Sequence, residues 1–324
     1  MNKKILIAVI IVIILAAIGG AYYYMNSQDD GTITIGCQPS DHHAALYVAQ
    51  AQQQYEKQGL KVKTVQFNNG GDEMTALASG ELDIAYVGTA PALSSIEKGV
   101  PAKIVGSAQQ EGSAIVVAKN SNITSVKDLK GKKVATLGEA SIQNTLLKYA
   151  LKQNGVNASD VEISAMKPAN MNDALKSGKI DAMVNPEPYP TTAVMKGYGK
   201  ILENSSEIVP GHPCCVIVAS DDFIKNHPDQ LSKILQIHEN ATNFINENPA
   251  AAAKLLPSDI VSNTTIEEQS LKNGHFVSGL NSTFKQSVDQ FMQIEIDLGL
   301  MKEKLSDDKI FYDVNSTNTT KSTA

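Results

Sequence analysis

Short apolar runs and amphipathic stretches alternate along the chain from residue 32 onward. Segments 32–37 and 60–67 have the two-residue period of a strand, and 43–58, which stops at Gly59, has the pattern of a helix. Further strands are predicted at 103–106, 113–118, 161–166 and 214–219, and further helices at 228–248, 266–271 and 283–298. Strands that alternate with helices predict an α/β fold.

One pattern occurs twice. The segment ALASGELDI at 76–84 recurs as ALKSGKIDA at 174–182. Each copy predicts a helix that stops at a glycine, followed by a short apolar strand and a turn containing Gly or Pro. Two copies predict two similar α/β lobes that face each other across a cleft lined by the strand ends.

The first 25 residues have a different pattern. Lys3 and Lys4 precede an uncharged apolar stretch, 5–25, which is long enough to span a bilayer. Residues 1–25 are therefore predicted to be either a transmembrane anchor or a signal peptide cleaved near Gly19–Ala21, with 26–31 as a tether. Both alternatives place the rest of the chain outside the cytoplasmic membrane. The Ser/Thr/Asn-rich tail, 314–324, is expected to be disordered.

Composition restricts how a ligand can be held. The net charge is −6, and no basic patch is apparent, so nucleic acid is not an expected partner. All 28 basic residues counted as Lys or Arg are lysines. An anionic ligand would therefore have to be bound by backbone N–H groups, helix N-termini, hydroxyls, His or Lys instead of a guanidinium group.

Four segments together resemble a known family: 76–91, 123–134 with its DLKGK sequence, the Glu187-Pro188 turn and the helix at 226–249. In this order they resemble the type II periplasmic-type substrate-binding proteins of ABC importers. Within that group the chain is most similar to the proteins that bind nitrate, taurine, alkanesulfonates and the thiamine pyrimidine. The resemblance extends over about residues 32–300. It departs from the family where Asn185-Pro186 replace a frequent Trp.

The resemblance implies two lobes joined by two crossovers, expected at 117–120 and 216–220. Lobe 1 would comprise 32–118 and 219–313, and lobe 2 would comprise 119–218. It also implies hinge closure around a small-molecule solute and delivery of that solute to a membrane permease. We expect a monomer that needs no cofactor.

The candidate site residues of the first lobe follow its predicted strands. A helix N-terminus would offer free N–H groups and partial positive charge to an anion. A glycine turn would let the backbone approach a ligand, although plain capping and turn geometry would explain the same residues. These candidates are Ser40, His42 and His43 at the first helix start, Gly88, Thr89 and Ala90 after the first repeat, and Gln110.

The second lobe supplies the opposing candidates. Glu139, Ala140, Ser141 and Gln143 lie at a helix start, Asn185 and Glu187 follow the second repeat, and His212 and Cys214 precede the return to the first lobe. A carboxylate in the cleft would suit a zwitterion such as taurine. An organic sulfonate or a similar zwitterion is therefore the preferred solute, with nitrate and bicarbonate as other possibilities.

Three alternative functions are also compatible with the sequence. The histidines, Cys214 and Glu187 could converge on a metal ion, although their spacing matches no metal motif. Some relatives are enzymes that make the thiamine pyrimidine from their own histidine, but they carry a denser cysteine cluster. Eight Asn-x-Ser/Thr sequences and the polar tail would fit a surface sensor or adhesin.

Overall fold

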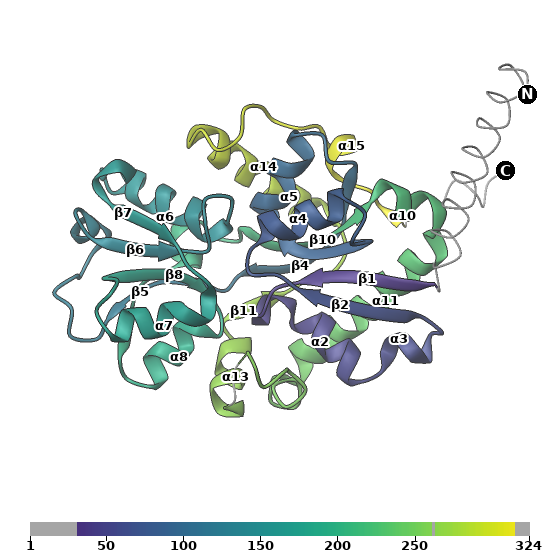
Figure 1. The fold of residues 1–324 in the computed structure, drawn as a ribbon, viewed down its shortest axis with the longest axis horizontal. Coiled ribbons are helices and arrows are strands. Elements are labelled where there is room, and N and C mark those ends of the chain that lie inside the picture. Colours follow the sequence, from purple (N-terminus) through teal and green to yellow (C-terminus); the bar gives the residue numbers. More distant parts are fainter. Residues whose placement is uncertain (1–30, 261–262, 315–324) are drawn as a thin grey trace, which may run out of the picture.

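The computed structural model describes residues 31–260 and 263–314, and these form two α/β lobes that lie side by side (Figure 1). The predicted α/β class and the two-lobed arrangement are confirmed. The predicted anchor or signal peptide and almost all of the predicted tail lie outside the described residues. Among the described residues, the structure contains no helix of the length and apolarity that crossing a membrane requires.

The first lobe is built on a six-stranded mixed sheet. β1 pairs in parallel with β2 and β3, whereas β10 runs antiparallel between β3 and β4. In sheet order the strands are β11 (Gly274–Phe276), β4 (Ala102–Glu111), β10 (Pro213–Ser220), β3 (Ile84–Gly88), β1 (Thr32–Cys37) and β2 (Lys61–Gln66).

The helices of the first lobe come from both ends of the described chain. They are the 3₁₀ helix η1 (Asp41–His43), α2 (Ala44–Ala51), α3 (Gln54–Lys57), α4 (Gly70–Ala78), α5 (Thr89–Glu97), α10 (Asp221–Asn226), α11 (Pro228–Glu247), α12 (Pro249–Ala252), α13 (Thr264–Leu271), α14 (Ser282–Asp297) and α15 (Asp307–Ile310). The long helix predicted at 228–248 is confirmed as α11. The helix predicted at 43–58 is broken, because Gln53 adopts a positive φ of 56° between α2 and α3.

The second lobe contains a five-stranded sheet. Its strands, in order, are β7 (Glu162–Ala165), β6 (Lys133–Thr136), β8 (Ala182–Pro186), β5 (Ser113–Ala118) and β9 (Gly199–Asn204). Its helices are η2 (Val126–Leu129), α6 (Ile142–Gln153), η3 (Ala158–Asp160), α7 (Pro168–Lys176), α8 (Tyr189–Met195) and α9 (Ser205–Ile208).

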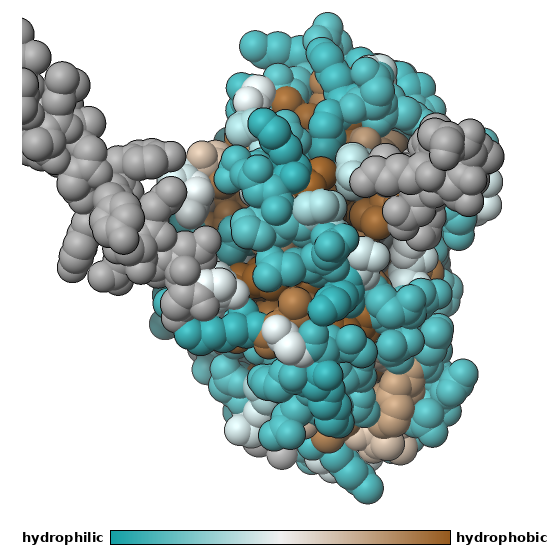
Figure 2. All heavy atoms as spheres, turned by 90° about the vertical axis from the view of Figure 1, so that its right-hand side faces the viewer, coloured by the Kyte–Doolittle hydropathy of each residue, from teal (hydrophilic) through white to brown (hydrophobic). Residues whose placement is uncertain are grey.

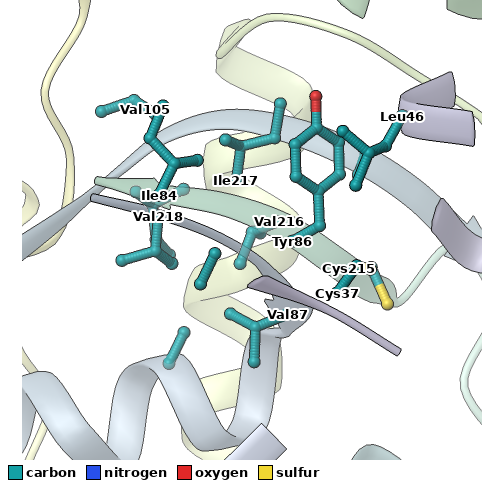
Figure 3. Close-up of a cluster of buried hydrophobic side chains, with 14 of the residues drawn as sticks. Cys37, Leu46, Ile84, Tyr86, Val87, Val105, Cys215, Val216, Ile217 and Val218 are labelled. Atoms are coloured by element: carbon teal, nitrogen blue, oxygen red, sulfur yellow. The ribbon is translucent and has the colours of Figure 1, made fainter. Parts of the chain in front are cut away.

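The core of the first lobe forms where β3 and β10 pack together. Figure 3 shows Ile84, Tyr86 and Val87 of β3 beside residues of β10, and the labelled side chains include Cys215. Burying such apolar side chains stabilises the fold by about 1.5–3 kcal/mol for each large one. The outer face of this lobe, on the right in Figure 1, is mainly hydrophilic, with apolar atoms visible between the polar side chains (Figure 2).

The repeated sequence makes an equivalent hydrogen bond between neighbouring strands in each lobe. The Asp83 carboxylate accepts a 2.7 Å hydrogen bond from the Thr34 amide of β1, and the Asp181 carboxylate accepts a 2.8 Å bond from the Lys133 amide of β6. Each aspartate thus joins the start of its strand to the neighbouring parallel strand. The predicted correspondence of the two segments is confirmed at this level.

The sheet topology corrects both predicted crossovers. The first lies at Glu111–Gly112, not at 117–120, because β5 pairs along its length with β8 and β9 of the second sheet. Both crossover residues have positive φ, 60° at Glu111 and 73° at Gly112. The return crossover lies between α9 and β10, at 209–212, because α9 packs against β5 and β9 of the second sheet whereas β10 pairs with β3 and β4. The second lobe therefore contains 113–208 instead of 119–218.

The two lobes are in direct contact on both sides of the junction. The Ser40 hydroxyl donates to the Glu187 carbonyl at 3.0 Å, and the Tyr189 hydroxyl donates to the Pro39 carbonyl at 2.9 Å. The Thr145 hydroxyl of α6 donates to the Glu295 carboxyl group of α14 at 2.6 Å. These contacts describe a closed arrangement of the lobes.

Candidate functional site

A cavity of about 30 Å³ lies between the lobes. It forms where β1 and β3 of the first lobe and β6 and β8 of the second reach their carboxyl ends, since residues that follow or end each strand line it. This is the place where α/β sheets usually bind ligands. The volume exceeds the room that one water molecule needs, and the closed lobes mean that a larger solute must enter while they are apart.

Helix N-termini from both lobes open into this cavity. Gly88 and Pro91 belong to the start of α5, Gly70 begins α4, Ser141 caps α6 and Pro168 begins α7. Each N-terminus presents N–H groups and partial positive charge. Among the lining residues none is a lysine, so these helix ends are the main source of positive potential there.

Of these helix ends, those of α5 and α7 have no side-chain cap, and of these two only α5 begins with buried N–H groups. Its N-cap is Gly88, which provides no side-chain hydrogen bond, and the first two helical residues, Thr89 and Ala90, are buried. Asn69 at the start of α4 and Ser141 at the start of α6 do accept bonds from the backbone of their helices. An acceptor on a ligand is therefore best placed at α5.

Seven of the predicted site residues line the cavity, and both lobes contribute. They are Ser40, His42, His43, Gly88, Ser141, Gln143 and Cys214. Ser40 is the N-cap of η1, since its hydroxyl accepts from the His42 amide. Gln143 is buried and donates to the Ser113 hydroxyl at 3.1 Å.

The other predicted residues are turned away from the cavity or lie beside it. Thr89 donates to the Cys214 carbonyl, Ala90 packs in the core, Gln110 donates to the Gly211 carbonyl and Asn185 donates to the Pro168 carbonyl. Glu139 and Ala140 are exposed in the turn before α6. His212 is buried, with its Nδ1 at 2.8 Å from the Val209 carbonyl.

Glu187 does not line the cavity between the lobes. Its carboxyl group accepts from the Thr191 hydroxyl at 2.8 Å and from the Asn273 amide at 2.8 Å. It lines a separate hollow beside the crossovers. The cavity therefore lacks the carboxylate that was expected to favour a zwitterionic solute.

The imidazoles and thiols in the cavity have strongly altered acidities. Burial lowers the pKa of His43 to about 3, and the neighbouring His42 adds to this effect. Burial also opposes ionisation of Cys214, but its contacts with Cys215, His42 and His212 outweigh that and lower its pKa. Burial likewise works against the charged form of His42, yet Cys214 raises its pKa. The neutral His43 accepts from the Gln38 amide through Nδ1 at 2.8 Å.

Several lining residues were not predicted. Gln38, Pro39 and Cys215 adjoin predicted positions, whereas Gly70 and Pro168 begin helices that follow other strands. Their position could have been found by treating every predicted strand-to-helix turn as a candidate. Leu137 and Ile142 carry no such signal, because apolar residues of this kind are also typical of the core.

Comparison with known proteins agrees with this architecture. The model of the NMT1-like family matches residues 26–257. The chain belongs to this family. A Bacillus subtilis (strain 168) protein named for binding aliphatic sulfonates is 32% identical over 222 residues, which are 68% of this chain and 66% of that relative. This NMT1-like chain thus aligns with a little under two thirds of the relative's length.

Two solved structures show the same fold. The ligand-binding component of an ABC-type import system from Staphylococcus aureus, with zinc bound, has a TM-score of 0.76 at 22% identity, covering 88% of this chain and 97% of that one. The alkanesulfonate-binding protein SsuA from Xanthomonas axonopodis pv. citri, bound to MOPS, has a TM-score of 0.75 at 20% identity, covering 87% and 98%. The NMT1-like chain therefore shares a two-lobed fold with binding proteins.

Proposed function

We propose that the protein captures an alkanesulfonate between its lobes and delivers it to an ABC permease on the outer side of the cytoplasmic membrane. The observation that carries this proposal is the uncapped, buried start of α5 at the cavity. Its amides would bind the sulfonate oxygens, because no arginine exists in the chain and no lysine lines the cavity. The relatives named for sulfonate binding support the same solute class.

The rest of the cavity wall favours an alkyl group over an ammonium group. Pro39, Leu137, Ile142 and Pro168 offer apolar surface, and the lining residues include no Asp or Glu. The ammonium group of taurine would lose its hydration without meeting a carboxylate, which costs affinity. A simple alkanesulfonate therefore fits this cavity better than a zwitterion.

Binding without chemical change is the proposed activity, with the monomer as the working unit. Lobe closure around the solute would create the surface that the permease recognises. The reported relatives are named for binding, which supports a binding role over an enzymatic one.

Thermal unfolding of the purified full-length protein against a solute panel tests the proposal. The panel contains methanesulfonate, ethanesulfonate, taurine, nitrate and bicarbonate. An alkanesulfonate at about 100 times its Kd should add about 2.7 kcal/mol to the free energy of unfolding. Taurine should bind more weakly. A shift produced by nitrate alone, or tighter binding of taurine, would contradict the proposed solute class.

A built-in anion should compete with the solute. Gln143→Glu places a carboxylate at the second position of α6 inside the cavity, where the helix N-terminus stabilises it. We expect the affinity for alkanesulfonates, measured by calorimetry, to fall by about tenfold or more while the unfolding temperature is nearly unchanged.

The matched control is Gln153→Glu, at the exposed C-terminal end of the same helix. It adds the same charge far from the cavity, so the affinity should stay at its original value. Equal losses in the two variants, or none in either, would exclude the start of α6 from the site.

A further inference from the structure

Three buried side chains that can bind a metal ion meet in the cavity wall. The Nδ1 atom of His42 lies 3.3 Å from the Sγ atom of Cys214 and 3.7 Å from the Sγ atom of Cys215. The three atoms lie within 4.8 Å of one another, and none of the side chains is more than 5% exposed. Within 31–260 and 263–314, no other His, Cys, Asp or Glu residues form such a group.

These separations match the edges of a tetrahedral metal site. Zinc bonds of about 2.3 Å to a thiolate and about 2.0–2.1 Å to an imidazole place neighbouring N and S ligands about 3.6 Å apart. The two distances from His42 lie on either side of that value. Both cysteines are free thiols in this structure.

The hydrogen bonding of His42 leaves the correct nitrogen available. Its Nε2 atom lies 2.8 Å from the Gly112 carbonyl oxygen. Because a carbonyl can only accept, Nε2 carries the hydrogen, and the lone pair of the neutral ring is on Nδ1, facing both sulfurs. Metal-binding histidines commonly donate their other ring N–H to a backbone carbonyl in the same way. Gly112 belongs to the first crossover, so the hinge itself orients this ring.

His212 interacts with the Cys214 thiol and has a further buried ring nitrogen. Its Nδ1 lies 2.8 Å from the Val209 carbonyl, which leaves the lone pair on Nε2. That Nε2 atom is buried and has no hydrogen-bond partner among the described residues. A buried polar atom without a partner is unfavourable, and a metal ion bound to Cys214 would supply one.

We propose that His42, Cys214 and Cys215 bind one thiophilic cation, Zn²⁺ or Cu⁺, with His212 or a water molecule as the fourth ligand. Thiolate and imidazole donors favour these ions. Binding of Zn²⁺ would displace the two thiol protons into solvent, so the occupied centre would be electrically neutral. A neutral centre would not change the positive potential of the helix N-termini that would attract an anion. The metal site is argued from His42, Cys214 and Cys215 alone, so it does not depend on the sulfonate proposal.

The test uses the reduced, metal-free, full-length protein titrated with Zn²⁺ in competition with a chromophoric chelator. We expect one equivalent to bind with the release of protons, and Co²⁺ in its place to give a thiolate-to-cobalt charge-transfer absorption. Cys214→Ser and Cys215→Ser should each weaken Zn²⁺ binding about a hundredfold and abolish that absorption, and His42→Gln should weaken binding at least about tenfold.

Cys37→Ser is the matched control. Cys37 is also a buried free cysteine, but its thiol lies outside the group of three ligand atoms. This variant should bind Zn²⁺ and Co²⁺ as the original protein does. The proposal is overturned if the original protein binds no stoichiometric Zn²⁺, or if either Ser variant at 214 or 215 binds it unchanged.

A measurement on the original protein tests the site even if the variants fail to fold. Bound Zn²⁺ should slow the alkylation of two of the three thiols, located by mass spectrometry, while equal alkylation rates with and without Zn²⁺ would overturn the site. Methanesulfonate binding by the metal-free protein is measured in parallel. If the metal-free protein binds no methanesulfonate but binds Zn²⁺ as expected, the sulfonate proposal is overturned and the metal site is retained.

Discussion

At the scale of single residues, hydrogen bonds to backbone carbonyls connect the closed lobes. The Tyr189 hydroxyl of the second lobe bonds to the Pro39 carbonyl beside the cavity. Tyr189→Phe removes a hydrogen bond made only when the lobes are closed, whose net contribution is about 0.5–1.5 kcal/mol. Calorimetry with the preferred sulfonate should therefore show an affinity about two- to tenfold lower.

The half-buried Tyr149 of α6 provides the control for this substitution. Tyr149→Phe removes the same hydroxyl from a residue that does not line the cavity. Its affinity should equal that of the original protein. An unchanged affinity in Tyr189→Phe would show that this bond does not contribute to closure.

At the scale of elements, the start of α5 approaches the start of α6 across the cavity. A Cβ atom at Gly88 would lie 3.3 Å from Cγ1 of Ile142 and 3.3 Å from Cδ of Pro91. Gly88→Ala should therefore hinder closure, with a drop in sulfonate affinity of about tenfold and a stability loss of about 1–3 kcal/mol at most. Calorimetry and urea unfolding measure the two effects separately.

Gly106→Ala in β4 is a close steric match for this change. Its Cβ would lie 3.3 Å from Leu235 and 3.4 Å from Ile217, all within the first lobe. It should cost similar stability but leave the affinity intact. If both variants bind equally well, the approach of α5 to α6 does not limit closure.

At the scale of the whole molecule, buried carboxyl groups make stability depend on pH. Burial raises the pKa of Glu295 to about 7, with Thr145 opposing and Glu97 adding to the shift. Burial likewise raises the pKa of Glu267 to about 7 against a contact with Asp41. The folded state binds these two protons more tightly than the unfolded chain does. The stabilisation that the two groups contribute is therefore fully present below about pH 4.5 and is lost as the pH rises through about 7.

Urea unfolding at pH 5 and pH 8 measures this dependence. A folded-state pKa of about 7 for Glu295 against an unfolded value of about 4.5 corresponds to about 2.5 kcal/mol of stability lost between pH 5 and pH 8. Glu295→Gln should flatten the pH profile, whereas Glu303→Gln at an exposed position should leave it unchanged. Equal or greater stability at pH 8 in the original protein would contradict the prediction.

The sequence alone determined the local features of this protein. Alternation of apolar segments predicted the strands, the two copies of the ALxSG pattern predicted two lobes, and the resemblance predicted the family. Seven candidate residues, among them Gly88 and Ser141, line the cavity because they follow strand ends, where ligands of α/β sheets usually lie, and their role in binding stays a prediction.

Only the tertiary structure decided which sheet each strand joins and where each side chain points. The apolar pattern of β5 would fit either sheet. Only its observed pairing with β8 and β9 assigns it to the second lobe, which places the crossover at Glu111–Gly112. Glu187 likewise faces Asn273, more than 80 residues away. Local pattern encodes periodicity and turns, whereas register, crossover and the meeting of His42 with Cys214 depend on contacts between residues distant in the chain.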